Sequence, residues 1–321
     1  MVNEFELIRN YFGALAPSAP GLLAGIGDDC ALLQAAGNEA LAVTTDTLIC
    51  GRHFPEDAPP FDIGWKALAV NLSDLAAAAA EPRWFTLALT LPSADSAWLK
   101  EFADGLGALA RQQRVALVGG DTTRGALSIT ITAIGVAPPA QALNRRGARS
   151  GDAVCVTGTL GDAAAGLRLW SAGSAGVRDV SGDARYLIER LNRPQPRVAA
   201  GIALRGLAHA AIDLSDGLAG DLRHILDASG VGADVWLERL PASPALERAA
   251  AGADRWSLQT VGGDDYELCI CLPSDAVERA RAALDVPLTE IGRVKDVRDL
   301  HWIDASGRYV DWQGTGYRHF S

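Results

Sequence analysis

The chain has 321 residues, of which 49% are hydrophobic and 21% are charged, and its formal net charge is -10. That length and balance predict a globular protein of two domains. The acidic charge and the lack of a basic stripe exclude a nucleic-acid-binding surface. There is no basic and apolar leader, and the most apolar stretch, residues 67–80, is too short and too polar to span a bilayer. We therefore expect a cytoplasmic protein without a membrane segment.

The first 136 residues alternate between strand and helix patterns. Period-two alternation and short apolar runs predict strands at 40–45, 85–91, 115–118 and 127–136. Between them, one helix is expected from a cap at Asp62 to about Ala80, and another from a cap at Ser93 through Leu109. The run Gly105–Ala110 matches a loose dinucleotide-binding pattern, but it lies inside the second helix with no strand before it. We therefore interpret it as part of that helix.

Pro138 and Pro139 break this alternation. Residues 138–150 are rich in Arg, Gly and Ala and are predicted to link a domain at 1–137 to a second domain at 151–321. In the second domain we expect strands at 153–157, 210–214, 231–237, 267–272 and 288–294, and helices near 161–170, 183–191, 196–207, 218–228 and 275–283. The tail from Trp302 to Ser321 has no regular pattern. The predicted fold class is α/β (α+β), with two domains.

The five cysteines do not predict a disulfide framework or a zinc site, because their number is odd and no C-x-x-C pair occurs. Cys269 and Cys271 are two residues apart in a strand-like run, so we expect them to face the same side and to pack as small apolar side chains.

Aspartates recur beside Gly, Ser or Thr where apolar runs stop. Six segments share this feature: 27–29, 44–47, 71–74, 119–122, 213–217 and 262–265. One Asp beside Gly is usually a turn or a helix cap, but six such segments indicate carboxylates that meet in a shared cleft. Two carboxylates about 4 Å apart repel by roughly 4 kcal/mol at an effective dielectric constant near 20, so the cluster needs cations. Mg²⁺ binds carboxylate and phosphate oxygens together, which predicts a polyphosphate site.

Common nucleotide-binding motifs are missing from this chain. There is no G-x-x-x-x-G-K-[ST] motif, and only three lysines occur, at Lys66, Lys100 and Lys295. Positive charge for phosphates must therefore come from arginine, and the segment 144–149, which contains Arg145, is the best candidate. The alternative is a basic loop that is simply solvated.

Six segments, in this order, resemble the thiamine-monophosphate kinase family, which belongs to the superfamily of aminoimidazole ribonucleotide synthetase and selenophosphate synthetase. The segments are 25–33, 45–48, 66–76, 119–125, 211–218 and 262–268, and the resemblance runs from Phe5 to Phe320. It implies direct, in-line, Mg²⁺-assisted transfer of a phosphoryl group from ATP to thiamine monophosphate, the last step of thiamine diphosphate biosynthesis. It also implies a potassium requirement and a homodimer formed by the N-terminal sheet domains, each followed by an α/β C-terminal domain.

The resemblance assigns roles residue by residue. The implied Mg²⁺ ligands are Asp29, Thr44, Thr45, Asp46, Asp74, Asp121, Asp213 and Asp216. The implied ATP contacts are Gly120, Asp121, Arg145 and Ser215, and the implied thiamine phosphate contacts are His53, Asp264 and Tyr317. Without the family, His53 reads as a surface histidine and Tyr317 as a residue that packs the tail. The family often has Glu where this chain has Asp264, which shortens that carboxylate by one methylene group.

No residue is assigned as a general acid or base, because the attacking phosphate oxygen is already ionised near pH 7. Two other functions stay open. A sister enzyme of the superfamily is disfavoured because Cys30 follows two aspartates, no lysine precedes Lys66, and the chain ends in Ser321 rather than Cys. A regulatory protein that binds metal or nucleotide without catalysis is disfavoured because every acidic position is filled.

Overall fold

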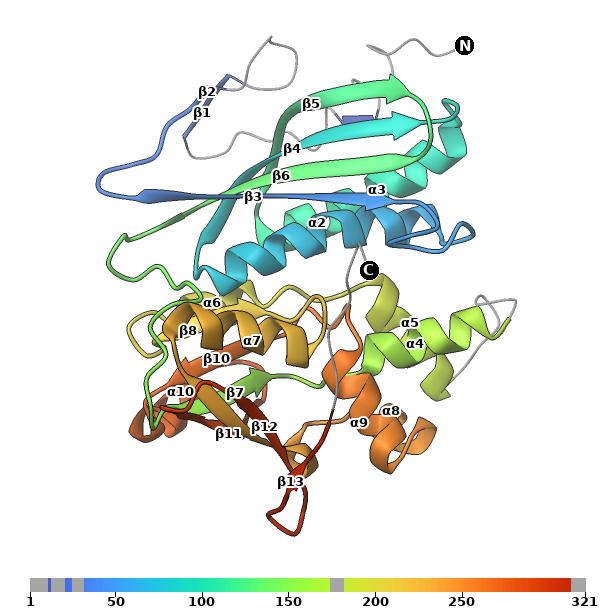
Figure 1. The fold of residues 1–321 in the computed structure, drawn as a ribbon. Helices are drawn as coiled ribbons and strands as arrows, with labels where there is room; N and C mark the ends of the chain where they lie inside the picture. The colour runs from blue at the N-terminus through green and yellow to red at the C-terminus, as the bar shows by residue number, and fades with distance from the viewer. Residues whose placement is uncertain (1–10, 13–20, 25–31, 174–181, 313–321) are drawn as a thin grey trace. The chain divides into compact units, whose positions relative to one another are not determined.

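The computed structural model describes residues 11–12, 21–24, 32–173 and 182–312. The chain divides into two compact units (Figure 1). Unit 1 comprises Met1–Leu75 and Ala80–Ala140, and unit 2 comprises Ala76–Ala79 and Gln141–Ser321. Each unit has its own main β-sheet flanked by helices, so the predicted α/β class is confirmed. The domain limits at 137 and 151 stay predictions.

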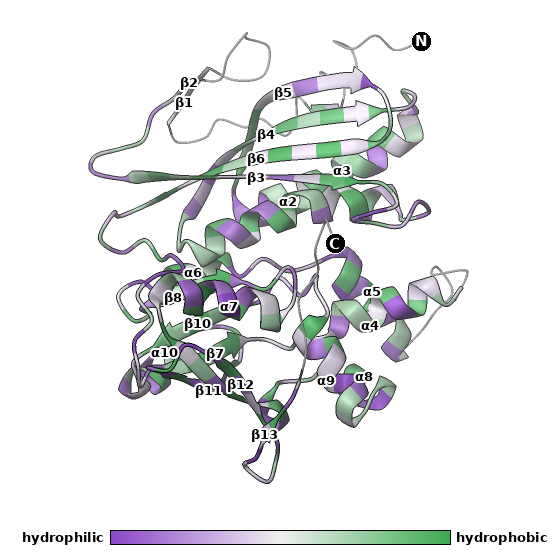
Figure 2. Cartoon of the chain, in the orientation of Figure 1, coloured by the Kyte–Doolittle hydropathy of each residue, from purple (hydrophilic) through white to green (hydrophobic). Residues whose placement is uncertain are grey.

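Unit 1 contains a four-stranded sheet in the order β3-β6-β4-β5. The strands are β3 (Ala40–Ile49), β4 (Glu81–Leu91), β5 (Ala116–Arg124) and β6 (Ser128–Ala137). β6 pairs antiparallel with β3 and with β4, whereas β4 and β5 run parallel. Figure 2 shows alternating bands of higher and lower hydropathy along β4 and β6, as expected for strands with one buried face. A separate two-stranded sheet joins β1 (Leu22–Ala24) to β2 (Leu32–Leu33).

Two helices, α2 (Pro60–Ala77) and α3 (Ser96–Gln113), lie on one side of this sheet (Figure 1). They approach each other closely, because a Cβ atom at Gly105 would be 1.9 Å from the carbonyl oxygen of Phe61. Gly64 on α2 is equally tight against Phe102 on α3. The glycine pattern at 105–110 therefore serves helix packing, as the sequence indicated.

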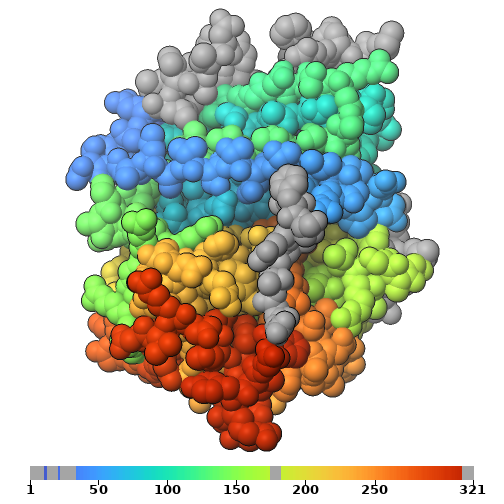
Figure 3. Space-filling view, viewed as in Figure 1, coloured from blue at the N-terminus to red at the C-terminus, as the bar shows by residue number. Residues whose placement is uncertain are grey.

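Strand β3 lies at the edge of the sheet and alternates between half-buried and exposed residues. Three of its five exposed positions carry large apolar side chains, which are Leu41 at 54%, Val43 at 62% and Ile49 at 47% exposure. Figure 3 shows β3, in blue, running along the surface of unit 1. An exposed apolar edge strand is a surface that folded proteins normally cover.

Unit 2 contains a seven-stranded sheet in the order β13-β12-β9-β11-β7-β10-β8. Its strands are β7 (Ala153–Thr157), β8 (Ala210–Asp213), β9 (Gly232–Trp236), β10 (Leu268–Leu272), β11 (Leu288–Lys295), β12 (Leu300–Ile303) and β13 (Tyr309–Val310). All neighbours pair antiparallel except β12 and β9, which are parallel. The helices are α4 (Asp162–Ser171), α5 (Gly182–Asn192), α6 (Val198–Ala203), α7 (Leu218–Ser229), α8 (Pro244–Ala249), α9 (Gly252–Val261) and α10 (Val277–Ala283). Two short 3-10 helices, Leu237–Arg239 and Ser274–Ala276, complete the unit.

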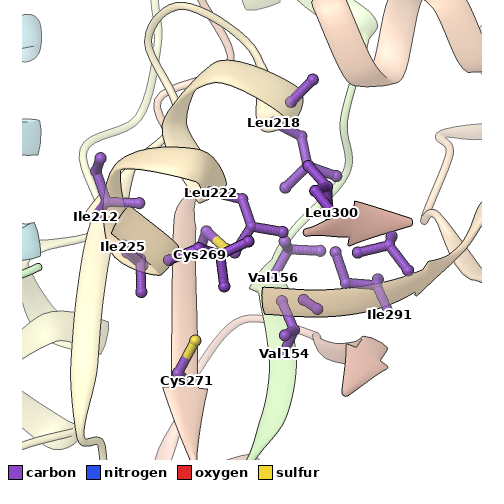
Figure 4. Packing of buried hydrophobic residues seen from close by; sticks show 14 of the residues in the cluster. Val154, Val156, Ile212, Leu218, Leu222, Ile225, Cys269, Cys271, Ile291 and Leu300 are labelled. Atoms are coloured by element: carbon purple, nitrogen blue, oxygen red, sulfur yellow. The ribbon is translucent and has the colours of Figure 1, made fainter. Parts of the chain in front are cut away.

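Helix α7 packs its apolar face on the sheet of unit 2 (Figure 4). Leu222 and Ile225 of α7 belong to the same buried cluster as Val156 of β7 and Cys269 and Cys271 of β10. The two cysteines are free and fully buried, which confirms that they pack as apolar side chains. This packing fixes where the first turn of α7 lies against the end of β8.

The structure corrects three local predictions. Helix α3 is capped by Asp95, not Ser93, because the Asp95 carboxylate accepts from the amides of Ala97 and Trp98 at 2.8 and 3.3 Å. Helix α2 begins at Pro60, which places Asp62 in its first turn rather than at its cap. The tail is not irregular throughout, because β12 and β13 pair there and extend the sheet.

Candidate functional site

The half-buried face of β3 brings three of the predicted ligands together. The Thr44 hydroxyl on β3 donates a hydrogen bond to the Asp74 carboxylate on α2. Two residues along β3, the Asp46 amide donates to Oδ1 of Asn71 at 3.1 Å, and Asn71 donates back to the carbonyl of Ala67 at 3.1 Å. Asn71 is fully buried, so it fixes the position of α2 on β3. Oxygen atoms, such as those of hydroxyl and carboxylate groups, are the metal ligands that Mg²⁺ prefers.

Thr45 lies on the opposite face of β3. Its hydroxyl is 2.9 Å from the Thr132 hydroxyl on β6, and the next exposed pair, Thr47 and Thr130, is 2.8 Å apart. Side chains alternate along a strand, so Thr45 is separated from its two predicted partners, Thr44 and Asp46, by the sheet itself.

The backbone at Gly120 lies directly against β4. Its φ is 152°, and a Cβ atom there would be 1.9 Å from the carbonyl oxygen of Leu87, so a side chain does not fit. Asp121 follows and is exposed. The strand pairing leads from Asp46 to Ile131, from Ile131 to Leu87 and from Leu87 to Gly120. At about 4.8 Å per strand, Asp46 and Gly120 are roughly 14 Å apart along this row.

His53, the predicted substrate contact of unit 1, has a defined tautomer. Its Nδ1 atom accepts a hydrogen bond from the amide of Ile49 at 2.9 Å, so the neutral ring carries its proton on Nε2. The Nε2–H group is thereby a hydrogen-bond donor, which is the character that a phosphate oxygen requires. His53 is half-buried, and this hydrogen bond fixes the orientation of its ring.

In unit 2, the predicted ligands Asp213 and Asp216 flank the turn between β8 and α7. Asp213 is buried at the end of β8. The amides of Ser215 and Asp216 both donate to Oδ2 of Asp221, at 3.0 and 3.1 Å. Asp221 is in the first turn of α7 and is 3% exposed. Burial raises its pKa to about 7, against the lowering effect of the two amide donors.

The loop that carries Arg145 is anchored to β8 and to the C-terminal end of α7. The carbonyl of Asn144 accepts from the amide of Ala211 on β8 at 3.0 Å. The Ser229 hydroxyl at the end of α7 donates to the carbonyl of Arg145 and accepts from the amide of Gly147, both at 3.2 Å. The Arg145 charge lies near enough to Asp221 to lower the pKa of that carboxyl. The structure thus brings the Arg145 charge within electrostatic range of the first turn of α7, where Asp221 lies.

The segment that carries Asp264 pairs with the same turn. The amides of Asp264 and Tyr266 donate to the carbonyls of Ser215 and Leu214, both at 2.8 Å. A Cβ atom at Gly263 would be 2.4 Å from the carbonyl oxygen of Ser215, so only glycine allows this approach. Asp264 has a φ of 68°, and its carboxylate accepts from the Tyr266 hydroxyl at 3.1 Å.

A buried group of charges holds the other end of this segment, and the sequence did not predict it. Glu267 is fully buried and accepts from Arg197 at 2.5 and 2.6 Å, from Arg190 at 3.0 Å and from the Thr157 hydroxyl at 2.7 Å. The partners are 70 to 110 residues away from Glu267, so no local pattern signals the pairing. A buried carboxylate with this many donors is well compensated.

Two further acids belong to the buried group. Both carboxylate oxygens of Asp265 accept from the amide of Gly161, at 3.0 and 2.8 Å, and burial raises the pKa of Asp265 well above its ordinary value. Asp162 accepts from the hydroxyls of Ser243 and Thr159, both at 2.6 Å. Together these contacts fix the segment from Gly262 to Glu267 on the side away from the turn.

Some predicted residues cannot be described in this way. Asp29 and Tyr317, with the neighbouring Asp28, lie outside the described residues. Within the described ranges, no three His, Cys, Asp or Glu side chains gather closely enough to hold a metal ion. The convergence of aspartates from both units therefore stays a prediction. Of the helices in the described ranges, none combines the length and apolar character needed to cross a membrane.

Comparison with known proteins identifies relatives across both units. Residues 27–137 match the family model "AIR synthase related protein, N-terminal domain", and residues 149–303 match "AIR synthase related protein, C-terminal domain". The thiamine-monophosphate kinase of Salmonella typhimurium is 48% identical over 324 residues, covering 99% of this chain and 98% of that enzyme. These matches confirm the predicted superfamily and its two-domain fold.

Solved structures agree. The crystal structure of thiamine-monophosphate kinase from Stenotrophomonas maltophilia K279a has a TM-score of 0.88 at 48% identity, covering 95% of this chain and 97% of that one. A structure described as AaThiL complexed with AMPPCP and TMP has a TM-score of 0.79 at 30% identity, covering 99% of this chain and 97% of that one.

Proposed function

This chain belongs to the thiamine-monophosphate kinase family, and on that premise we propose that it transfers the terminal phosphoryl group of ATP to the phosphate of thiamine monophosphate. The products are ADP and thiamine diphosphate. The observation that carries the proposal is the extent of the similarity, since 99% of this chain aligns with 98% of the Salmonella enzyme. The similarity therefore includes both units rather than one domain alone.

The reaction brings together two anions, ATP and thiamine monophosphate. The activation barrier of phosphoryl transfer therefore depends on their charge repulsion and their alignment. The acceptor phosphate is ionised near pH 7 and attacks without a general base. Holding donor and acceptor phosphates in line converts a collision between two anions into a step within one complex. The chain's own part is to bind both phosphates, to orient them and to exclude competing water.

We propose that Mg²⁺ balances the charge. The side chains proposed as metal ligands fit Mg²⁺, because all of them offer oxygen atoms. Two of them, the Thr44 hydroxyl and the Asp74 carboxylate, are in direct contact. Held by these oxygen ligands, Mg²⁺ would supply positive charge that offsets the negative charge of the phosphates. The proposed ligands are Asp29, Thr44, Asp46, Asp74, Asp121, Asp213 and Asp216. Thr45, which the sequence also implied, is left out of this set because its hydroxyl faces the other side of β3.

For ATP, we propose contacts from the β8–α7 turn and the anchored arginine. The Arg145 guanidinium matches the geometry of phosphate oxygens, and the loop that carries it is tied to Ala211 and Ser229. The amides of Ser215 and Asp216 are taken by Asp221, which leaves the Ser215 hydroxyl as the group of that residue available to nucleotide. Gly120 and Asp121 are the proposed contacts from unit 1.

For thiamine monophosphate, we propose His53, Asp264 and Tyr317 as contacts. The Nε2–H group of His53 suits a phosphate oxygen, because Nδ1 already accepts from Ile49. Asp264 is one methylene shorter than the glutamate common in the family, and the Tyr266 hydroxyl braces its carboxylate. A carboxylate near the cationic thiazolium ring is electrostatically favourable.

The decisive experiment follows thiamine diphosphate directly. Purified protein is incubated with ATP and thiamine monophosphate, with and without Mg²⁺, and the products are separated by chromatography. We expect thiamine diphosphate and ADP in equal amounts, only with Mg²⁺. ATP consumption that is equal with thiamine monophosphate, with unphosphorylated thiamine and with no acceptor would contradict the proposal and favour a sister activity. Replacing K⁺ by Na⁺ in the same assay tests the proposed potassium requirement.

We further propose that two copies pair through the exposed face of β3. Leu41 and Val43, both more than half exposed, lie on an edge strand, and Ile49 on the same face is 47% exposed. If the same surface of a second copy packs against these side chains, both apolar rows are buried and neither copy is left with an exposed apolar edge strand. We also infer a cytoplasmic location, because cells keep the ATP that the reaction consumes in the cytoplasm.

A further inference from the structure

The turn between β8 and α7 ends a strand, so its backbone amides need partners outside the sheet. Two of them, Ser215 and Asp216, find the same acceptor atom, Oδ2 of Asp221. The carboxylate reaches backwards over the start of its own helix, five and six residues along the chain. One oxygen atom thus fixes two successive peptide groups of the turn.

Asp221 itself is held firmly. It is 3% exposed, and its neighbours Leu218 and Leu222 on α7 are buried in the main cluster of unit 2. Its carboxylate does not cap the helix, since the N-cap position is Gly217 and no side chain makes a capping hydrogen bond there. Burying a carboxylate is costly, and within the described part of the chain this one accepts its hydrogen bonds from the turn. Its contribution is therefore the shape of that turn.

The carbonyl groups of the same turn pair with the segment that contains Asp264 and Tyr266. The carbonyls of Leu214 and Ser215 accept from the amides of Tyr266 and Asp264, both at 2.8 Å. Ser215 is thus bonded through its amide to Asp221 and through its carbonyl to Asp264. A shift of the peptide at Ser215 moves the group proposed for ATP and the group proposed for thiamine monophosphate together.

We propose that Asp221 is a positioning residue that sets the binding of both substrates through the Leu214–Gly217 turn. The inference rests on the proposed function of Ser215 and Asp264, and it adds a residue that touches neither substrate. What matters is the acceptor oxygen at Oδ2, because both contacts are hydrogen bonds from amides.

Three variants separate this role from general stabilisation. Asp221→Ala removes the oxygen, and we expect the KM for ATP and the KM for thiamine monophosphate each to rise about tenfold or more. Asp221→Asn keeps an amide oxygen at the same place, and both KM values should stay within about threefold of the wild type. Tyr266→Phe removes only the hydroxyl that braces Asp264, so it should raise the KM for thiamine monophosphate and leave that for ATP unchanged. Asp227→Asn, an exposed acid on the same helix, is the control for the change in charge.

Melting temperatures are measured alongside, and binding of a non-hydrolysable ATP analogue is followed by calorimetry. Weaker analogue binding by Asp221→Ala, restored in Asp221→Asn, supports the proposal even if the wild type forms no thiamine diphosphate. The binding measurement therefore tests the role of Asp221 separately from the proposed kinase activity. Unchanged KM values and analogue affinity in Asp221→Ala, with only a lower melting temperature, would overturn it. So would an Asp221→Asn variant as defective as Asp221→Ala.

Discussion

The hydroxyl of Thr44 on β3 donates its hydrogen bond to the carboxylate of Asp74 on α2, thirty residues further along the chain. This contact orients a carboxylate towards the half-buried face of the sheet, where Asp46 also lies. It places two proposed ligands, Thr44 and Asp74, on one surface of unit 1.

Replacing Asp74 by Asn tests this surface. Asparagine retains an oxygen that accepts from Thr44, so we expect the melting temperature to change little. Loss of the charge removes a proposed Mg²⁺ ligand, and turnover should fall about 100-fold or more. Asp104→Asn, which neutralises an exposed acid paired with Lys100 on α3, should keep normal turnover. An Asp74→Asn variant with wild-type kcat and an unchanged Mg²⁺ requirement would contradict the assignment.

Arg145 offers a test of the proposed ATP contact. A charged hydrogen bond is worth about 1.5–3 kcal/mol, so Arg145→Ala should raise the KM for ATP about 10- to 100-fold. Arg146→Ala removes the neighbouring exposed arginine and serves as the control. Steady-state kinetics at saturating thiamine monophosphate measure both. Equal effects of the two substitutions would show that general positive charge, rather than one guanidinium, attracts the nucleotide.

Neighbouring glycines on β5 provide a matched pair. A Cβ atom at Gly120 would lie 1.9 Å from the Leu87 carbonyl, whereas one at Gly119 would meet nothing within 4 Å. We expect Gly120→Ala to lower the free energy of unfolding by about 1–3 kcal/mol, since the strand must shift to admit the methyl group. Gly119→Ala should be nearly neutral. Urea denaturation measures the free energy of unfolding of both variants. Equal values would mean that β4 and β5 are not packed as closely as described.

Asp265 predicts a dependence of stability on pH. Burial raises its pKa well above the ordinary 3.8, so the folded state holds the proton more tightly than the unfolded state does. The free energy of unfolding contributed by this group is therefore full below that ordinary value and falls as pH rises through the folded-state pKa.

Asp265→Asn removes this titration while leaving an oxygen for the amide of Gly161. We expect the variant to gain stability relative to the wild type as the pH rises from 3.8 towards the folded-state pKa of Asp265, by up to about 1.4 kcal/mol per pH unit. Asp304→Asn is the control, because the pKa of Asp304 is lowered to about 2 and its carboxyl is ionised throughout that range. A constant difference between Asp265→Asn and the wild type across these pH values would contradict the expectation.

The proposed pairing through β3 predicts that Val43→Glu yields a monomer. A glutamate at this 62% exposed position would bury an unpaired charge in the interface. Val297→Glu makes the same change at a 69% exposed valine of unit 2 and should leave a dimer intact. Sedimentation equilibrium measures the mass of each. A monomeric wild type, or a Val43→Glu variant that stays dimeric, would show that this face is not the interface.

Long, periodic elements were predictable from the sequence, because they depend on neighbouring residues. The expected acidic ends were only partly correct, since Asp213 ends β8 but Asp46 and Asp121 lie inside β3 and β5. The strands of the four-stranded sheet lie where the sequence patterns placed them, although β3, β4 and β5 are longer than expected. The short strands β1 and β2 were not predicted. Helices α8 and α9 were both missed, although Ser243 followed by Pro244 is a local signal for the start of α8. The pairing of β13 with β12 was missed because two residues carry no period.

The supporting side chains were not predictable in this way. Asp221 reads as an acid in the first turn of a helix, which usually interacts with the helix dipole. Its actual partners are amides before the helix, and they are fixed by how α7 packs on the sheet. The contacts of Glu267 to Arg190 and Arg197 depend on the folding of unit 2 as a whole.

The strand order of unit 1 also bears on how the nascent chain folds. β3 is made first, yet its only neighbour within that four-stranded sheet is β6, the last strand of the sheet to leave the ribosome. About 80 residues separate them, which is roughly 4–16 s of synthesis at 5–20 residues per second. For that interval β3 has no strand of this sheet to join, so the apolar side chains of Leu41, Val43 and Ile49 enter the sheet last although they are synthesised first.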